Sequence, residues 1–472
     1  MRKEDRDDDL VPFLGGGDGG GQSSKPKSKP LELEVGGNDN DNNDNEYDDD
    51  DDDDDDGHHG AGPPGSANTI QMVINIIISF VGAGLLGQPH AFMESGWMLG
   101  GLALLTVSAL NIYAMLRLPA VQLALMKRLA EQDDDDDVDD VDDASQPRQQ
   151  RPSLNSYSDL GRAVLGPRGE SMVVACLAIS QAGFATAYII FIAANLYSIA
   201  QISRFWVCMA CIPGLMGLVQ FRDLKSLSPF SLLANVANFC ALSAVLFQDY
   251  EQYQPHNDTI HAVQWGGLLY VIGITIYSME GVGLVLSLQA SYQQPQKFGM
   301  LLSTTLGVIS LFMVLFGAAG YWAFANDTQA PITLNLASHW SATFVKLALC
   351  LGLYLTYPIM MFPIWNIWET WQPRLQTDHQ SRRWLRSALV VASATVAYCI
   401  PHFGKFLSLV GSSICTLLGF VFPCWFHLQV LGKELPWWQY ILDIIVLVGG
   451  CIFGILGTYQ SVMAMVRGED ME

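Results

Sequence analysis

The chain has 472 residues, half of them hydrophobic, and a formal net charge of −22. The charge is localised, because residues 1–68 hold 21 acidic and 6 basic side chains and residues 125–151 hold 10 acidic and 4 basic ones. From about residue 69 onward the sequence contains repeated apolar runs, each long enough to cross the hydrocarbon core of a bilayer. This pattern predicts an all-α polytopic membrane protein and excludes a soluble enzyme; we expect no nucleic-acid partner.

The acidic segments predict the domain organisation. Residues 1–68 are rich in Gly, Asp and Asn, and such a segment cannot bury enough apolar surface to offset its ordering entropy. We therefore expect a disordered acidic cytosolic tail over residues 1–68 and a transmembrane domain over residues 69–466. An acidic cytosolic loop over residues 125–165 would be inserted in that domain, and residues 467–472 would form a short non-cytosolic tail.

The apolar runs predict eleven transmembrane helices, over residues 69–93, 97–122, 170–200, 203–220, 227–248, 262–289, 299–325, 341–362, 384–400, 403–430 and 437–466. With the N-terminus in the cytosol, the cytosolic loops carry fourteen Lys and Arg residues and the opposite loops three, as the positive-inside rule requires. The two N-x-T sequons, at Asn257 and Asn326, then fall on the non-cytosolic side, where they are candidate glycosylation sites. The odd number of spans places the C-terminus on that side too.

Two of these spans carry helix-weakening residues near their middle. The first contains Gly82, Gly84 and Gly87, and the sixth contains Gly281 and Gly283 directly after Glu280. A glycine weakens a helix interior by about 1 kcal/mol relative to alanine. Interrupted helices at equivalent positions of two halves indicate an inverted five-plus-five repeat with a central binding site.

An interrupted helix offers unpaired backbone groups to a ligand. The N-terminus of a half-helix presents amide donors and partial positive charge to an anion. We expect the carboxylate of an amino acid to bind the donors near Gly82, Ala83 and Gly84, and its ammonium group to bind carbonyls freed on the other broken helix. The alternative is that these glycines only permit tight helix packing.

Four stretches of the sequence resemble a known family. "VINIIISFVGAGLLGQPHAFMESGW" resembles the first span of the amino acid/auxin permease family, especially its vacuolar and lysosomal proton-coupled members. "YSMEGVGLVL" resembles the sixth span of that family, "LGLYLTYPIMMFPIWNIWE" the eighth and "GSSICTLLGFVFPCWFHL" the tenth. The resemblance covers residues 68–466 and implies a LeuT-type fold, with discontinuous helices 1 and 6, and secondary active transport of amino acids.

The resemblance also implies roles for individual residues. The substrate site would be formed by Gly82, Ala83, Gly84, Leu85, Glu280, Gly281 and Gly283. Ser79 stands where sodium-coupled relatives carry an asparagine ligand, and Thr356 matches a threonine that those relatives use. The missing asparagine favours protons over sodium as the coupling ion. His90 stands where relatives commonly carry an aromatic residue.

Glu280 is the strongest single candidate. A carboxylate at mid-membrane depth is energetically expensive and marks a functional site. Reversible protonation of Glu280 could couple a proton to substrate movement, and a permanent structural clamp on the unwound backbone is the alternative. Lys346 and Asp443 also lie in spans, but near their ends, where snorkelling or interface placement accounts for a charged residue.

These observations predict a secondary transporter that moves neutral amino acids by alternating access and is coupled to protons. The resemblance places it in a vacuolar, lysosomal or other endomembrane. One alternative is sodium-coupled amino acid uptake at the plasma membrane. The other is an amino-acid sensor that signals to a cytosolic partner through its acidic tail. We expect no enzymatic activity, cofactor or metal, because no extramembrane segment carries a nucleophile–base set, a phosphate loop or metal-ligand spacing.

Overall fold

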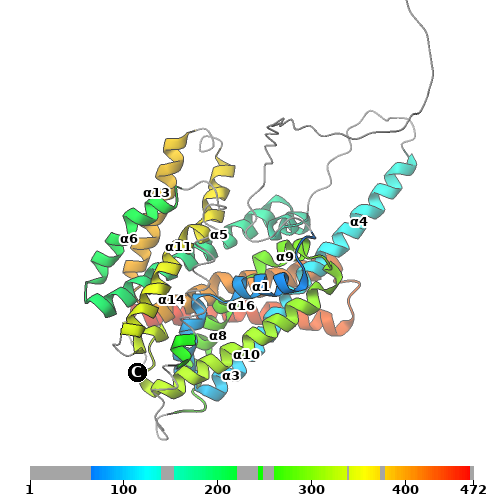
Figure 1. Cartoon of the computed structure of the whole chain (residues 1–472). Helices are drawn as coiled ribbons and strands as arrows, with labels where there is room; N and C mark the ends of the chain where they lie inside the picture. The colour runs from blue at the N-terminus through cyan, green and yellow to red at the C-terminus, as the bar shows by residue number, and fades with distance from the viewer. Residues whose placement is uncertain are drawn as a thin grey trace, which may run out of the picture. The chain divides into compact units, whose positions relative to one another are not determined.

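The computed structural model describes residues 65–139, 154–220, 243–247, 260–336, 340–372 and 378–467 (Figure 1). In these ranges the regular structure is helical apart from one isolated parallel bridge between Ala67 and Tyr292. Most of the predicted acidic tail, most of the predicted span 227–248 and the sequon at Asn257 lie outside the described residues.

The first predicted span is a broken helix. Helix α1 (Thr69–Phe80) begins at a capping box, in which Asn68 and Gln71 each accept a hydrogen bond from the backbone amide of the other. After Phe80 the helix stops, and a 3₁₀ segment η1 (Ala83–Gly87) leads into α2 (Gln88–Ser95) with a bend of 49°. The interruption predicted from the glycines of this span is therefore present.

The sixth predicted span is interrupted at the corresponding place. It consists of η2 (Trp265–Gly267), α8 (Leu268–Ser278), η3 (Val282–Leu284) and α9 (Val285–Ser291). Residues 279–281, which include Glu280, are not helical. Both predicted breaks thus occur, each directly after a helix and directly before a 3₁₀ turn.

Backbone hydrogen bonds join the start of α1 to the end of α9. The amides of Gly65 and Ala67 donate to the carbonyls of Ala290 and Ser291 at 3.1 and 3.0 Å, and the Gln293 amide donates to Ala67 at 3.1 Å. We call this set the first clasp. Because it pairs the beginning of one broken span with the end of the other, the two spans run antiparallel.

A second clasp joins the other ends of the same two spans. The Gln264 amide donates to the Ser95 carbonyl at 2.8 Å, and the Trp97 amide donates to the His261 carbonyl at 3.2 Å. Gly96 lies between these bonds with φ of +80°, and a Cβ there would lie 2.6 Å from the Ala262 backbone. Only glycine combines this backbone conformation with so close an approach.

The remaining helices surround the broken pair. They are α3 (Trp97–Met115), α4 (Arg117–Asp139), α5 (Tyr157–Ala200), α6 (Arg204–Leu218), α10 (Phe298–Phe324), α11 (Trp340–Trp371), α13 (His379–Cys399), α14 (Phe403–Val410), α15 (Phe422–Leu431) and α16 (Trp437–Val466). Short 3₁₀ turns η4 (Pro295–Lys297), η5 (Ala325–Asp327) and η6 (Ile332–Asn335) flank α10. Helices α6, α11 and α13 pack together (Figure 1).

Seven described helices are long and apolar enough to cross a membrane, and the bent pair formed by α1 and α2 makes up to eight. Two further predicted spans coincide with shorter or more polar helices. Helix α6 has only 15 residues, and α13 carries Arg382, Arg383 and Arg386 in its first two turns. The described residues therefore establish a polytopic helical membrane protein with seven or eight candidate spans.

The predicted tenth span is continuous but contains two π-helical segments. Between α14 and α15 lie η7 (Gly411–Cys415) and η8 (Leu417–Val421). Helix α8 packs against η7, and a Cβ on Gly411 would clash with the Gly273 carbonyl. π-segments of this kind occur frequently at functional sites, and here they border the break in the sixth span.

The inserted segment 125–165 is helical at both described ends. Helix α4 continues to Asp139. Helix α5 begins at Tyr157, after a capping box formed by Ser156 and Asp159. Gly166, with φ of +70°, then interrupts α5 before the membrane-spanning part.

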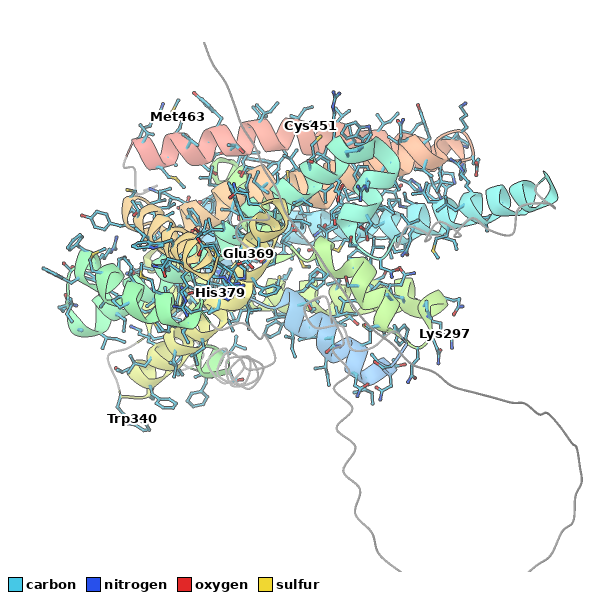
Figure 2. The ribbon with its side chains drawn as sticks, turned by 90° about the horizontal axis from the view of Figure 1, so that it is seen from above. Lys297, Trp340, Glu369, His379, Cys451 and Met463 are labelled. Atoms are coloured by element: carbon cyan, nitrogen blue, oxygen red, sulfur yellow. The ribbon has the colours of Figure 1, made fainter. Side chains whose placement is uncertain are left out.

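Helix α16 forms a lipid-facing edge. It runs along one side of the view in Figure 2, where Cys451 and Met463 are labelled on it. Large apolar side chains along it are exposed, Ile455 at 71% among them. Trp437 and Trp438 are also exposed at its start, as expected for an interfacial aromatic belt.

Candidate functional site

The break in the first span leaves backbone donors unused. The amides of Gly82, Ala83 and Gly84 have no hydrogen-bond partner within the described ranges, whereas the Leu85 amide donates to the Gly82 carbonyl at 3.3 Å. The first amides of any helix lack an intrahelical partner. Here they lie in the middle of a candidate membrane span and not at its end.

The break in the sixth span repeats this arrangement. The amides of Gly281, Val282 and Gly283 also lack a partner among the residues that the structure describes, and the Leu284 amide donates to the Gly281 carbonyl at 3.0 Å. The two breaks touch, since a Cβ on Gly281 would lie 2.5 Å from the ring of Phe80. Six unpaired amides therefore lie around one junction.

The glycines at this junction have different surroundings. A Cβ on Gly84 would lie 2.5 Å from Ser278 Oγ and 2.9 Å from the Tyr277 ring, so Gly84 allows η1 to contact α8. Gly281 likewise makes room for Phe80, and a Cβ on Gly283 would lie 2.9 Å from Leu177.

A Cβ on Gly82 would meet nothing within 4 Å, and Gly82 is exposed. Tight packing thus explains three of these glycines and leaves Gly82 facing open space.

The Glu280 carboxylate belongs to the same junction. It is partly accessible, and in the described part of the chain no hydrogen bond or ion pair to it is found. Its charge acts on Tyr157 of α5 and Cys415 of η7, which lie nearby. A clamp would require this carboxylate to accept a hydrogen bond from the unwound backbone, and the described residues show no such bond.

Three buried polar side chains around the breaks keep an atom unpaired. Gln88 Nε2 donates to Ser278 Oγ at 3.2 Å and Asn111 Nδ2 donates to the Met279 carbonyl at 3.0 Å. Gln88 Oε1, Asn111 Oδ1 and the Tyr277 hydroxyl have no partner in the described ranges. Unsatisfied buried polar atoms are rare in native proteins and need an explanation, and a polar ligand at this junction would supply one.

Sequence reasoning missed these three residues, although each carries a visible signal. Gln88 directly follows the glycine-rich stretch, Asn111 is a lone amide in an apolar span, and Tyr277 precedes Glu280 by three residues. What the sequence lacked was the direction of each side chain, because one helical face cannot be distinguished from another without the neighbouring helices.

The other predicted site residues are placed less directly. Leu85 is fully buried, so it packs beside the junction. Ser79 Oγ donates to the Asn75 carbonyl at 2.7 Å, and Thr356 Oγ1 donates to the Gly352 carbonyl at 3.0 Å. Both hydroxyls are therefore engaged with their own helices, and no bond joins them.

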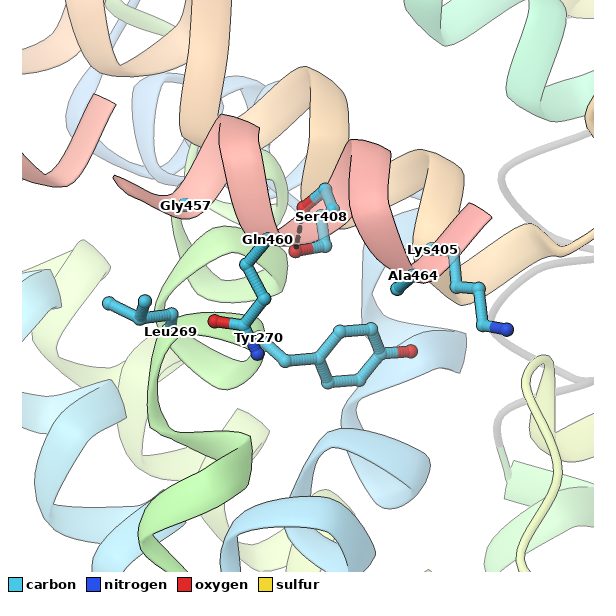
Figure 3. Close-up of a pocket in the computed structure, with 8 residues that line it drawn as sticks. Leu269, Tyr270, Lys405, Ser408, Gly457, Gln460 and Ala464 are labelled. Atoms are coloured by element: carbon cyan, nitrogen blue, oxygen red, sulfur yellow. Dashed lines mark hydrogen bonds between the residues drawn. The ribbon is translucent and has the colours of Figure 1, made fainter. Parts of the chain in front are cut away.

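His90 takes part in a polar cluster beyond the first break. Its Nδ1 lies 3.2 Å from the Tyr270 hydroxyl and its Nε2 lies 3.9 Å from Glu94 Oε1. Tyr270 and Lys405 also line a shallow pocket between α8, α14 and α16 (Figure 3). The remaining lining residues are Leu269, Ser408, Gly457, Gln460, Ser461 and Ala464, and Ser408 and Ser461 share a hydrogen bond of 3.1 Å. None of these residues belongs to either break.

The described sequon lies on the surface. Asn326 is exposed in the turn η5 after α10. The hydroxyl of Thr328, the third residue of the sequon, is buried and donates to the Ala325 carbonyl at 2.7 Å.

Comparison with known proteins supplies independent information. The chain matches the family described as "Transmembrane amino acid transporter protein" over residues 65–133 and 142–463. It is 34% identical over 426 residues to amino acid transporter AVT3C of Arabidopsis thaliana, covering 85% of this chain and 92% of that protein. It is 26% identical over 425 residues to vacuolar amino acid transporter 3 of Saccharomyces cerevisiae, covering 84% of this chain and 57% of that protein.

Solved structures give a weaker likeness. The structure of Mhp1, a nucleobase-cation-symport-1 family transporter, aligns with a TM-score of 0.49 and 10% sequence identity over 88% of this chain and 97% of that chain. A score below 0.5 does not establish a shared fold. The family match, in contrast, covers most of the chain and confirms the resemblance stated from the four sequence stretches. It also confirms that the protein is a transporter and not an enzyme: the chain belongs to the transmembrane amino acid transporter family.

Proposed function

We propose that the protein transports neutral amino acids by alternating access and couples this movement to protons. The observation that carries the proposal is the junction of the two broken spans. It combines six unpaired backbone amides, three unpartnered polar side-chain atoms and a carboxylate without a partner in the described ranges. This concentration of unpaired polar groups lies where the two broken spans meet.

The junction suits a zwitterion of modest size. Unpaired amides at the starts of η1 and η3 are donors for a carboxylate, and the charge of a half-helix N-terminus favours an anion. Helices α1 and α8 end at the same place, so their last carbonyls can accept from an ammonium group. The open space beside Gly82 lets a ligand approach the backbone closely.

Proton coupling is favoured over sodium coupling. Glu280 has no fixed partner in the described structure, so it can take up and release a proton. The Ser79 and Thr356 hydroxyls, the candidate coupling-ion ligands, are already bonded to their own helices. A hydroxyl that donates in this way keeps lone pairs for a cation, so sodium is disfavoured mainly because Ser79 stands where sodium-coupled relatives carry an asparagine ligand.

The proposed topology has eleven spans in an inverted five-plus-five arrangement of the LeuT type, with discontinuous helices 1 and 6. The antiparallel pairing of the broken spans at both clasps supports the inversion. The proposed orientation is a cytosolic N-terminus and a lumenal C-terminus, from the distribution of Lys and Arg. An endomembrane, vacuolar or lysosomal, is the proposed location, supported by the vacuolar transporter of yeast among the relatives.

Two other functions make different predictions. Sodium-coupled uptake at the plasma membrane would be abolished when choline replaces sodium at fixed pH. In an amino-acid sensor whose acidic tail signals to a cytosolic partner, deletion of residues 1–60 would abolish signalling. In a transporter the same deletion would leave flux intact.

Proteoliposomes provide the direct test. The protein is reconstituted, a pH gradient is imposed, and uptake of a mixture of labelled neutral amino acids is followed with and without a protonophore. We expect gradient-driven accumulation by the parent chain and downhill exchange without accumulation by Glu280→Gln. Glu131→Gln, which changes an exposed carboxylate on α4, is the matched control and should behave as the parent. Gradient-driven accumulation that persists in Glu280→Gln would remove Glu280 from the proton role.

A further inference from the structure

Helices α3, α15 and α16 meet at a buried polar group that is separate from the two breaks. His427 Nδ1 lies 2.6 Å from Asp443 Oδ2, and the Tyr113 hydroxyl donates to Asp443 Oδ1 at 2.7 Å. Asp443 is fully buried and the side chain of His427 is 2% exposed. Partners from two other helices therefore enclose Asp443.

The number of protons on this group sets its net charge. With two protons shared by the imidazole and the carboxylate, the pair is neutral, whether it is written as imidazolium and carboxylate or as imidazole and carboxylic acid. When one proton leaves, a carboxylate with a net charge of −1 stays buried, and a buried unpaired charge is strongly disfavoured. The neutral and the anionic form of the pair therefore differ by one proton.

The surroundings of the pair are asymmetric. The Arg117 guanidinium lies 4.0 Å from the centre of the Tyr113 ring, and among the described residues Cys424 of α15 is a further titratable group close to Asp443. Tyr113 and Arg117 are both partly exposed, so one side chain separates the carboxylate from solvent. Further along, Arg128 of α4 bonds the Val430 carbonyl and Glu434 at the end of α15. The positive charge of Arg117 favours the anionic form of the pair, so it makes release of the proton feasible.

Two short paths connect this pair to the break in the sixth span. On α3, Asn111 donates to the Met279 carbonyl at the break, only two residues before Tyr113. On α15, Phe426 packs edge-on against Tyr157 with ring centres 6.1 Å apart, and Tyr157 lies within electrostatic range of Glu280. A shift of α3 relative to α15 and α16 would therefore move groups that contact the break.

We propose that Tyr113, His427 and Asp443 form a second proton-binding site, which joins α3 to α15 and α16 and whose proton occupancy controls how readily the helices around the sixth-span break move apart. These residues do not touch the substrate, so they act by positioning. The inference rests on the proposed function in one respect: it assumes that the helices around the sixth-span break move during transport. It requires neither that Glu280 carries a proton nor that a pH gradient drives uptake.

Exchange at equal pH separates this proposal from the proposed function. Proteoliposomes are loaded with an unlabelled neutral amino acid, and the same pH is set on both sides. Entry of the labelled amino acid is then measured from about pH 5 to pH 8, a range that spans the unperturbed pKa of histidine. We expect the exchange rate of the parent chain to change by about fivefold or more across this range, because the protonation state of one group would set the rate. Glu280→Gln should retain at least part of that change.

Asp443→Asn is the decisive variant. Asparagine keeps the shape of the side chain, accepts from His427 and donates to Tyr113, but it does not ionise. We expect folded Asp443→Asn to exchange substrate with a rate that varies less than about twofold over the same pH range. Tyr113→Phe removes one hydrogen bond and should displace the pH profile, whereas Tyr440→Phe on the exposed face of α16 should not.

The result that overturns the proposal is a folded Asp443→Asn variant with the pH profile of the parent. If Asp443→Asn fails to fold, Tyr113→Phe and His427→Gln replace it, and parental profiles in both of these also overturn the proposal. If the parent shows no gradient-driven accumulation but Asp443→Asn still flattens its exchange profile, proton coupling fails and the second site stands.

Discussion

Gly82 and Gly84 are separated by one residue, yet the structure predicts opposite consequences for adding a methyl group to each. At Gly82 the backbone is extended, with φ of −126° and ψ of −163°, and a Cβ would meet nothing within 4 Å. Gly82→Ala should therefore change the free energy of unfolding by no more than about 0.5 kcal/mol. At Gly84 a Cβ would lie 2.5 Å from Ser278 Oγ, and overpacking of this kind costs about 1–3 kcal/mol.

The effect on transport should be reversed. A methyl group on Gly82 fills the open space through which a substrate carboxylate would reach the unpaired amides. Loss of one hydrogen bond to a charged group costs about 1.5–3 kcal/mol, and each 1.4 kcal/mol changes a binding constant about tenfold. We expect KM for uptake by Gly82→Ala to rise about tenfold or more while the thermal midpoint in detergent stays unchanged. Gly84→Ala should lower the thermal midpoint.

The measurement pairs thermal unfolding followed by tryptophan fluorescence with initial uptake rates in proteoliposomes. Gly307→Ala is the matched control, since a Cβ on Gly307 also meets nothing within 4 Å but lies on the exposed face of α10, away from both breaks. It should leave KM unchanged and should not lower the thermal midpoint, because alanine stabilises a helix interior by about 1 kcal/mol relative to glycine. An unchanged KM in a stable Gly82→Ala protein would refute the claim that the open space beside Gly82 admits the substrate.

Three further outcomes follow from the structure. Ser79→Ala and Thr356→Val should each keep uptake within about twofold of the parent in sodium buffer and in choline buffer, because proton coupling does not use their oxygens as cation ligands and their bonds within the helix add little net stability. Arg386→Met should lower the free energy of unfolding by about 3–5 kcal/mol, measured by thermal shift, because the Glu369 carboxylate of α11 would lose its ion-pair partner on α13. Asn326→Gln should remove a glycosidase-sensitive mobility shift of the protein expressed in a eukaryotic cell, and a protein without that shift would place Asn326 on the cytosolic side or leave it unmodified.

Both helix breaks could be predicted because their causes are local. Glycine clusters weaken a helix wherever it lies, and the interruptions occur next to Gly82 and next to Gly281, as the sequence indicates. The start of α1 at Thr69 is also local, since the capping box involves only Asn68 and Gln71. These features depend on a few consecutive residues and not on the rest of the fold.

The polar environment of the breaks could not be predicted, because it depends on contacts between distant residues. Asn111 reaches Met279 across 168 positions, and Tyr113 reaches Asp443 across 330. From the sequence, Asp443 is a charged residue near a helix end, and interface placement is its simplest explanation. Its enclosure by Tyr113 and His427 arises only when α3, α15 and α16 pack together.

The sequence by itself determined that the chain enters a membrane, that two of its helices break, and to which family it belongs, because apolar length, glycine placement and short motifs are properties of neighbouring residues. Tertiary structure alone decided which glycine faces open space and which faces a helix. Gly82 and Gly84 are the same residue in nearly the same position, and the atoms that distinguish them belong to residues almost two hundred positions away.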